Sequence, residues 1–310
     1  MDDRIYLSKK KGSGDIQYYL KKISELSGCN LSISVAPGEN SRLYVQNSDG
    51  ISAPLFLPFG GAISGEFLVD GEYEVVSMEL LSRIVRNVLG QFVFVDIGAN
   101  IGLISRQVAK LNPAEIYCYE ANPSVFSYLK RNMDLSTPVI HLNNEAVWKS
   151  SEEKEFIDTV DIDGYGSLNH EYFQKSLRLK KDLIHFTKTT LDISEECSKW
   201  KQKNLPIVYK SDIQGADLDL LLHIKNEKLF HISCGLIEIS NNEFGLLFGE
   251  LMEFFTKTHR SVVIAPDGII YKMTEHSKIE NIIEKNYNYV DIFFIRDFEN
   301  SGWYHSRPIL

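Results

Sequence analysis

The sequence predicts an α/β protein in which residues 91–310 build a mostly parallel sheet and residues 1–90 form a smaller α+β region. From residue 91, short apolar runs alternate with helical patterns, as in strand–helix–strand units. These runs are continuously apolar, which is typical of strands covered by helices on both faces. A turn signal, Pro266-Asp267-Gly268, separates two late apolar runs and predicts a hairpin that adds an antiparallel strand at the edge of the sheet.

Residues 1–90 show no regular alternation of strands and helices. Apolar residues at helical spacing predict a helix over Asp15–Ser27. Short strands and turns are expected over residues 31–75, and the Gly-rich and Phe-rich segment Leu55–Gly71 is expected to form turns and loops. A second helix is expected over Met78–Leu89, and Gly90 is a typical residue to end it.

The larger region is expected to alternate strands and helices in a regular order. The expected strands are Phe92–Asp96, Glu115–Glu120, Val139–Leu142, Pro206–Asp212, Cys234–Ile239, Ser261–Ala265, Ile269–Lys272 and Tyr289–Ile295. Helices are expected after the first two strands and near Phe244–Phe255, and the pair Asn122-Pro123 is a typical helix start. Residues 150–205 are highly charged and are expected to be irregular.

Composition and charge exclude several classes of function. The chain has 310 residues with 33 Lys and Arg against 42 Asp and Glu, a formal net charge of −9. Such a surface repels phosphates and disfavours nucleic acid as a partner. No apolar run reaches the roughly 18 residues of a membrane-spanning helix, and the first residues do not resemble a secretory signal, so we expect a cytoplasmic protein. The four cysteines form no C-x-x-C pair and are expected to be free thiols.

The most informative segment runs from Val95 to Gly102 and reads VDIGANIG: a strand end, a carboxylate, two glycines and a helix start. Glycine permits a tight turn and close approach of a ligand, and the helix start offers N–H groups to an anion. A dinucleotide motif counted from Gly98 would require further glycines where Asn100 and Leu103 stand. The charge of Asp96 would repel a diphosphate and suits a ligand that carries an ammonium or sulfonium group beside a carboxylate, as S-adenosylmethionine does.

Two further polar groups follow the next strands of the predicted sheet. Glu120 ends the second strand, where a carboxylate can accept hydrogen bonds from both hydroxyls of a ribose. A nicotinamide dinucleotide uses the same contact, so Glu120 does not discriminate between the two cofactors. The third strand is followed by Asn144, Glu145 and Ala146, which are candidates for contact with an adenine edge.

A string of motifs carries a resemblance to a known family. In chain order they are VFVDIGANIG (93–102), IYCYEANPSVFSYLKRN (116–132), NEAV (144–147), GYGSL (164–168), TTLD (189–192), IVYKSDIQGAD (207–217) and LIEIS (236–240). Over residues 92–240 the chain resembles FkbM-type class I S-adenosylmethionine-dependent methyltransferases. The resemblance implies a Rossmann-like methyltransferase sheet, and methyl transfer to a hydroxyl of a sugar, a natural product or a glycan such as a bacterial capsule or O-antigen polysaccharide.

The resemblance, together with strand position, assigns the candidate site residues. The candidate cofactor-binding residues are Asp96, Gly98, Ala99, Asn100, Gly102, Glu120, Ala121, Asn122, Asn144, Glu145, Ala146, Ser167 and Asp212. A sugar hydroxyl is a very weak acid, so transfer to it needs a base or a bound metal ion. Asp212 is the first candidate for base or metal ligand and Glu238 is the second, while Lys210 shares a sheet face with Asp212. Whether a divalent ion is used is left open.

The fourth-strand motif departs from the family pattern K-I-D-[VI]-E-G-x-E. Ser211 replaces an apolar residue, Asp217 replaces Glu, and Gln214 replaces a Glu and so lacks its charge. These changes at Ser211 and Gln214 keep open a non-catalytic partner protein with a methyltransferase fold. A nicotinamide-dependent oxidoreductase is a second alternative, since Glu120 alone does not discriminate between the cofactors. Residues 1–90 are expected to cover the acceptor site or to form an oligomer contact. In the inserted stretch, Asp161, Asp163, Asn169 and His170 are further candidates for ligand contact.

Overall fold

The computed structural model describes residues 30–34, 42–46, 55–58, 63, 73–86, 90–159, 166–169, 183–229, 231–240, 243, 246–266, 268–272 and 289–296. The chain divides into two compact units, Met1–Tyr73 and Glu74–Leu310. The larger unit therefore begins before helix α3 (Val75–Ile84), which sequence analysis assigned to the N-terminal region ending at residue 90. The helix predicted over Asp15–Ser27 lies outside the described residues.

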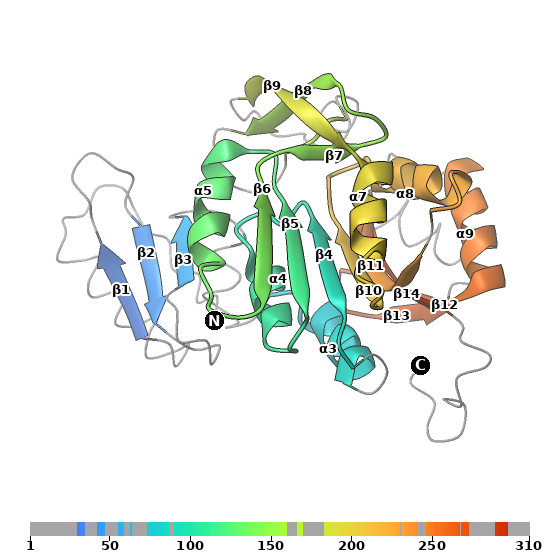
Figure 1. The fold of residues 1–310 in the computed structure, drawn as a ribbon, viewed down its shortest axis with the longest axis horizontal. Helices are drawn as coiled ribbons and strands as arrows, with labels where there is room; N and C mark the ends of the chain where they lie inside the picture. The colour runs from blue at the N-terminus through green and yellow to red at the C-terminus, as the bar shows by residue number, and fades with distance from the viewer. Residues whose placement is uncertain are drawn as a thin grey trace, which may run out of the picture. The chain divides into compact units, whose positions relative to one another are not determined.

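The smaller unit contains a three-stranded antiparallel sheet in the order β1-β2-β3. Its strands are β1 (Asn30–Ser34), β2 (Arg42–Gln46) and β3 (Leu55–Pro58) (Figure 1). Short strands were predicted here, but the prediction of loop structure from Leu55 onward is wrong for β3. Leu55 and Leu57 are buried at alternate positions, and Pro58 stands at the end of an edge strand, where a missing N–H costs no ladder hydrogen bond.

The larger unit is built on an eight-stranded sheet in the order β13-β12-β14-β11-β10-β4-β5-β6. Neighbouring strands from β11 to β6 pair in parallel, whereas β14 pairs antiparallel with both β11 and β12. The bounds are β4 (Val93–Ile97), β5 (Glu115–Tyr119), β6 (Val139–Asn143), β10 (Ile207–Ser211), β11 (Ile232–Ser240), β12 (His259–Ile264), β13 (Ile270–Lys272) and β14 (Tyr289–Arg296).

This sheet confirms the predicted fold class. The predicted hairpin is the antiparallel pair β12–β13, and β13 is the edge strand. The insertion of β14 between β11 and β12 was not predicted, because pairing between strands distant in the chain leaves no local pattern in the sequence.

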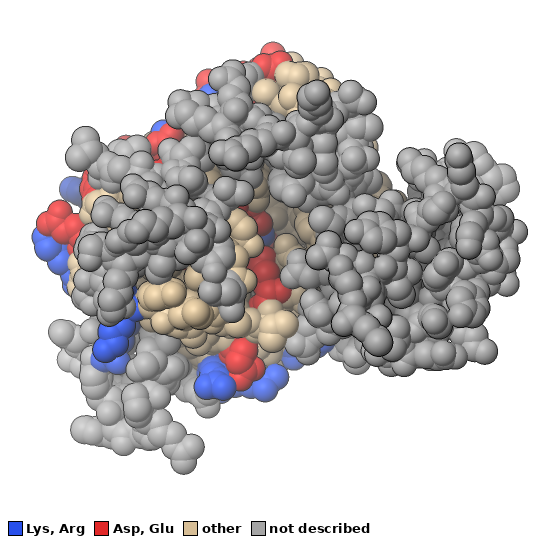
Figure 2. Space-filling view, turned by 180° about the vertical axis from the view of Figure 1, so that it is seen from behind, with Lys and Arg blue, Asp and Glu red and all other residues tan. Residues whose placement is uncertain are grey.

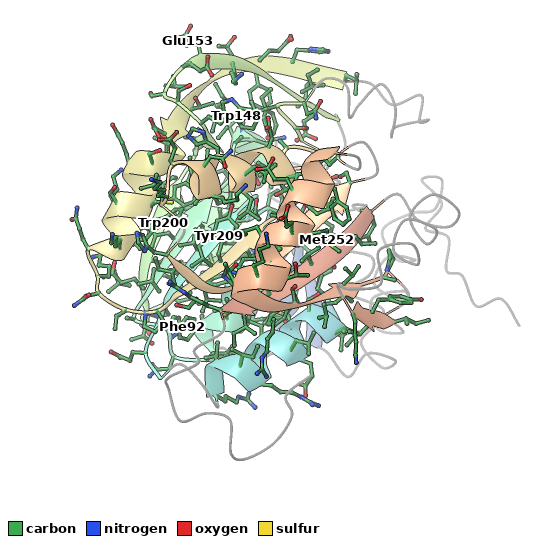
Figure 3. All side chains as sticks on the ribbon, turned by 90° about the vertical axis from the view of Figure 1, so that its right-hand side faces the viewer. Phe92, Trp148, Glu153, Trp200, Tyr209 and Met252 are labelled. Atoms are coloured by element: carbon green, nitrogen blue, oxygen red, sulfur yellow. The ribbon has the colours of Figure 1, made fainter. Side chains whose placement is uncertain are left out.

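Helices cover both faces of the large sheet, as Figure 1 shows. One face packs against α7 (Ile193–Lys201), α8 (Asp217–Asn226) and α9 (Leu246–Thr258), and the apolar cluster between them includes Trp200, Tyr209 and Met252 (Figure 3). The other helices in the described part of this unit are α3, α4 (Leu103–Ala109) and α5 (Pro123–Asn132). Asn122 caps α5 as predicted, since its Oδ1 accepts a hydrogen bond of 2.8 Å from the Ser124 N–H.

The prediction of irregular structure over residues 150–205 is wrong for the described part of that stretch. Three strands, β7 (Ala146–Trp148), β8 (Glu153–Thr159) and β9 (Leu183–Asp192), form a second sheet in the order β7-β9-β8. Along β9, exposed and half-buried residues alternate, and Phe186 packs on Phe156 of β8 with ring centroids 5.1 Å apart. Several charged residues of this hairpin, such as Glu153 and Glu155, occupy exposed positions, so the composition of the stretch resembled that of a loop.

Three of the cysteines lie in the described residues, and each is a free, buried thiol as predicted: Cys118, Cys197 and Cys234. Among the helices that the structure describes, none is long and apolar enough to cross a membrane.

Candidate functional site

The two glycines of the loop after β4 are required by packing within the protein. Gly98 has φ +74°, and a Cβ there would lie 1.9 Å from the carbonyl oxygen of Asp212. Gly102 has φ +86°, and a Cβ there would lie 2.8 Å from Cδ1 of Leu129. Sequence analysis attributed these glycines to the approach of a ligand. In the structure, the end of β10 and the side of α5 are what approach them.

The N–H groups of this loop are already used. All five between residues 98 and 102 donate within the protein, to Tyr119 O (from Gly98 and Ala99, both 3.0 Å), Glu120 Oε2 (from Asn100, 3.0 Å), Asn100 Oδ1 (from Ile101, 2.7 Å) and Ala99 O (from Gly102, 2.9 Å). Residues 98–102 therefore offer no free backbone donor to a diphosphate, whereas the expected anion contact at the helix start, from Leu103 onward, stays a prediction.

Asp96 lies behind the loop and is fully buried. Its Oδ2 accepts a hydrogen bond of 2.6 Å from Ser105 Oγ, and its Oδ1 lies 3.6 Å from Nζ of Lys210. Burial raises the pKa of Asp96, and the Lys210 ammonium opposes that rise. The Lys210 ammonium also donates to the carbonyl oxygen of Gly98 at 3.1 Å. The carboxylate that the sequence assigned to a cofactor thus has partners within the protein.

A cavity with about 610 Å³ of empty space, counting the open solvent at its mouth, lies at the carboxyl ends of β4, β5 and β10. Its lining comprises Ile97, Gly98, Asn100, Tyr119, Glu120, Ala121, Val125, Glu145, Ala146, Val147, Phe156, Asp158, Gly166, Leu168, Asp212, Ile213 and Ala216. On the face drawn in Figure 2, Asp and Glu side chains gather in a hollow of the described surface. The position agrees with the sheet edge at which open parallel sheets bind ligands.

The cavity brings together about half of the predicted cofactor residues. Those that line it are Gly98, Asn100, Glu120, Ala121, Glu145, Ala146 and Asp212. The others stand behind this lining: Asp96, Ala99, Gly102, Asn122, Asn144 and Ser167. The polar side chains of this second group make hydrogen bonds within the protein, so they support the cavity wall rather than form it.

Glu120 is the buried carboxylate of the cavity wall. Its Oε1 accepts from the Asn122 N–H at 2.8 Å, and its Oε2 accepts from the Asn100 N–H at 3.0 Å. Burial raises the pKa of Glu120 to about 7, with a further contribution from the charge of Asp158. Each carboxylate oxygen has two lone-pair sites, so both oxygens keep capacity for a donor from a ligand.

Asp158 lines the cavity and was missed by sequence analysis. It lies on β8 and is 3% exposed, and its Oδ2 accepts a hydrogen bond of 2.6 Å from Nδ2 of Asn122. The signal that would have found it is the alternation along β8, where Phe156 and Asp158 occupy inward positions two residues apart. An inward carboxylate on an amphipathic strand is a candidate for a site.

Residues 166–169 clamp the loop that follows β10. Ser167 Oγ donates to the carbonyl oxygen of Gln214 at 2.7 Å, and Asn169 Nδ2 donates to that of Gly215 at 2.5 Å. Gly166 and Leu168 line the cavity on the same side. Ser167 and Asn169 therefore shape the site through the backbone. Asp161, Asp163 and His170 lie outside the described residues.

The two candidate catalytic carboxylates meet at a glutamine. Gln214 Nε2 donates to Oδ1 of Asp212 at 2.6 Å and to Oε1 of Glu238 at 3.1 Å. Lys210 shares the sheet face with Asp212 as predicted, and its Nζ lies 3.6 Å from Oδ2 of Asp212. Burial raises the pKa of Glu238 well above its ordinary value, and the charges of Asp212 and Asp291 add to the rise.

Asp212 has no role in capping helix α8. The N-cap of that helix is Ala216, which has no side-chain cap, and the Ile213 N–H donates instead to Asp217 Oδ2 at 2.9 Å. Asp217 also accepts a hydrogen bond from the Ser211 hydroxyl. Ser211 and Asp217, which both depart from the motif of the resembled family, thus form one buried contact with each other.

Within the described part of the chain, no group of three or more His, Cys, Asp or Glu is arranged to hold a metal ion.

No protein-family model matches the chain, and no curated protein sequence matches it. Solved structures similar to it include a SAM-dependent methyltransferase from Agrobacterium tumefaciens (10% identity, TM-score 0.41, 85% of this chain and 72% of that one). An rRNA methylase from Streptococcus thermophilus is also similar (11%, 0.37, 71% and 96%), as is M. jannaschii TYW2 in complex with AdoMet (13%, 0.35, 85% and 90%). Likenesses at this level concern the fold and assign no activity to this chain.

Proposed function

We propose that the protein is an S-adenosylmethionine-dependent O-methyltransferase that acts on a hydroxyl of a sugar or glycan. The observation that carries the proposal is the pairing of two features at one cavity. A buried carboxylate, Glu120, can accept hydrogen bonds from the two hydroxyls of a ribose, and the neighbouring glycine loop has no free N–H for a diphosphate. A dinucleotide would need both the carboxylate and free N–H groups for its diphosphate, whereas S-adenosylmethionine has no diphosphate and needs only the carboxylate.

The chemistry of the lining fits this cofactor. Four carboxyl groups line the cavity, those of Glu120, Glu145, Asp158 and Asp212, and no Lys, Arg or His stands among the described lining residues. Such a wall favours a ligand that carries positive charge, as a sulfonium does, and opposes a diphosphate. Apolar side chains from α5, β7 and β8 provide the flat, water-excluding contacts that an adenine ring requires.

Bound S-adenosylmethionine would supply an electrophilic methyl group on a sulfonium. Asp212 would accept the proton of the acceptor hydroxyl while the oxygen–carbon bond forms and the sulfur–carbon bond breaks, leaving a methyl ether and neutral S-adenosylhomocysteine. A positioned base of this kind contributes about 10²–10⁴-fold to a rate. Lys210 stabilises the negative charge of Asp212 from 3.6 Å away, on the side next to the Gly98 loop.

The sugar or glycan acceptor is supported by the sequence resemblance over residues 92–240 rather than by the cavity.

Binding of the cofactor is measured first, by titration calorimetry with S-adenosylmethionine, S-adenosylhomocysteine, NAD⁺ and NADH. We expect heat from the first two only. Transfer of a labelled methyl group to a panel of neutral and acidic oligosaccharides, with and without Mg²⁺, then tests the reaction.

Each outcome separates the alternatives. Binding of a nicotinamide dinucleotide without binding of S-adenosylmethionine would overturn the proposal in favour of an oxidoreductase. Binding of S-adenosylmethionine with no transfer to any oligosaccharide would favour a non-catalytic partner protein. Labelling of RNA in place of oligosaccharides would keep the cofactor and overturn the proposed acceptor. Light scattering on the same sample tests the proposed homo-oligomer.

A further inference from the structure

We infer that Gln214 is a positioning residue of the proposed site: its amide holds Asp212 where the carboxylate favours a sulfonium over a neutral thioether. The inference rests on the proposed function and adds one residue to it. The role of this residue does not follow from the strand order or from the list of residues that line the cavity. Gln214 itself is not among the residues that line the cavity. It acts through Asp212, which does line the cavity.

The amide geometry is the first step. The amide nitrogen of glutamine carries two hydrogens, and in Gln214 they are directed to two different carboxyl groups, Asp212 Oδ1 at 2.6 Å and Glu238 Oε1 at 3.1 Å. Two neighbouring carboxyl groups repel when both are charged. A neutral double donor between them fixes their positions without adding a charge of its own.

The backbone of Gln214 is fixed by contacts with the 166–169 segment. Its φ is +54° and that of Gly215 is +84°, so two successive residues hold the left-handed conformation. The carbonyl oxygens of both residues accept hydrogen bonds from the 166–169 segment, one from Ser167 and one from Asn169. A glutamine adopts this conformation only where surrounding contacts impose it. The direction of the amide is therefore set by tertiary structure.

The carboxyl groups near the side-chain amide of Gln214 have different neighbours. Glu238 and Asp291 are half-buried on adjacent strands, in register with each other, and desolvation raises the pKa of both well above ordinary values. This shift disfavours the charged form of both side chains. The Asp212 side chain is 22% exposed and has the Lys210 ammonium at 3.6 Å. Asp212 is therefore the member of this group that has a cation beside it, and it stands at the cavity wall.

A consequence follows for ligand preference. S-adenosylmethionine and S-adenosylhomocysteine share every group except the methyl group and the positive charge on sulfur. Their affinity ratio therefore reports the electrostatic effect of the protein at the sulfur. If Gln214 only stabilised the loop after β10, its loss would lower the affinities for both ligands by the same factor. If it positions Asp212, its loss weakens the charged ligand selectively.

The test compares wild type with Gln214→Met, which keeps the length of the side chain and removes both donors. Gln202→Met, at the exposed C-cap of α7, is the matched control. Calorimetry at pH 7.5 gives the affinities for S-adenosylmethionine and S-adenosylhomocysteine. We expect Gln214→Met to lower the ratio of the two affinities about tenfold, the loss of one hydrogen bond to a charged group, with the thioether affinity within about threefold of wild type. Gln202→Met should match wild type.

The outcomes distinguish this inference from the function on which it rests. If wild type binds neither ligand, the proposed function fails. If wild type binds both and Gln214→Met leaves the ratio unchanged, or weakens both ligands equally, the proposed function stands and the inference is overturned. Gln214→Asn, which keeps the amide on a shorter stem that cannot reach both carboxyl groups, should change the ratio in the same direction. If neither variant folds by thermal melting, Gln214 is a structural residue and the inference is overturned.

Discussion

Replacing Gly98 with alanine should separate the ends of β4 and β10. The new Cβ would lie 1.9 Å from the carbonyl oxygen of Asp212, 2.9 Å from its carbonyl carbon and 3.3 Å from Cγ2 of Ile213. The oxygen belongs to the backbone, so no side-chain rotation relieves the contact. It is also held in place, because the Asp212 N–H donates to Ile97 O at 3.0 Å across the same pair of strands.

The expected loss of unfolding free energy has two parts, and a second variant measures one of them alone. An alanine with a left-handed backbone costs about 1–2 kcal/mol relative to glycine, and a forced contact in a packed region adds about 1–3 kcal/mol. Gly98→Ala should therefore lose about 2–5 kcal/mol of unfolding free energy. Gly90 has φ +62° with nothing within 4 Å of its added Cβ, so Gly90→Ala should lose the first part alone, about 1–2 kcal/mol.

Urea denaturation of wild type and both variants measures these free energies, and calorimetry with S-adenosylmethionine measures the effect on the site. We expect Gly98→Ala to bind the cofactor at least tenfold more weakly, because the shift moves Asp212. Gly90→Ala should bind as wild type does. Equal stability of the two variants, within about 0.5 kcal/mol, would refute the assignment of Gly98 to the contact between β4 and β10.

Four further predictions use other residues of the site. Because burial raises the pKa of Glu120 to about 7, its protonation as the pH falls through 7 should weaken S-adenosylmethionine binding, and Glu120→Gln should remove that dependence in calorimetry from pH 6 to 8.5. The same shift should make the ligand-free protein lose stability as the pH rises from about 4.5 to 7, which thermal melts at several pH values check. Asp212→Asn should bind S-adenosylhomocysteine normally yet transfer methyl at least 100-fold more slowly in the labelled-methyl assay. Asn122→Ala removes the cap of α5 and the donor to buried Asp158, so urea denaturation should show a loss of about 2–4 kcal/mol.

Sequence patterns predicted the central strands well because each is a short apolar run with its own boundary signals. β4, β5 and β10 appear within one or two residues of the expected ranges. The patterns failed where structure depends on distant pairing. The place of β14 between β11 and β12 is set by contacts across the sheet, and β8 and β9 pair across an inserted segment. For the same reason Asp291, which pairs in register with Glu238 on the adjacent strand, was not recognised.

The cavity lies at the sheet edge where the sequence predicted a site, but only about half of the predicted cofactor residues line it, and the strand geometry explains why. Side chains alternate along β4, so Asp96 and Ile97 point to opposite faces of the sheet. Ile97 lines the cavity, whereas Asp96 points toward helix α4 and accepts from Ser105. A motif names both residues without stating which face each occupies. The alternation rule, applied to the motif, would have assigned Asp96 to the support of the loop, and the same rule applied to β8 would have added Asp158 to the cavity.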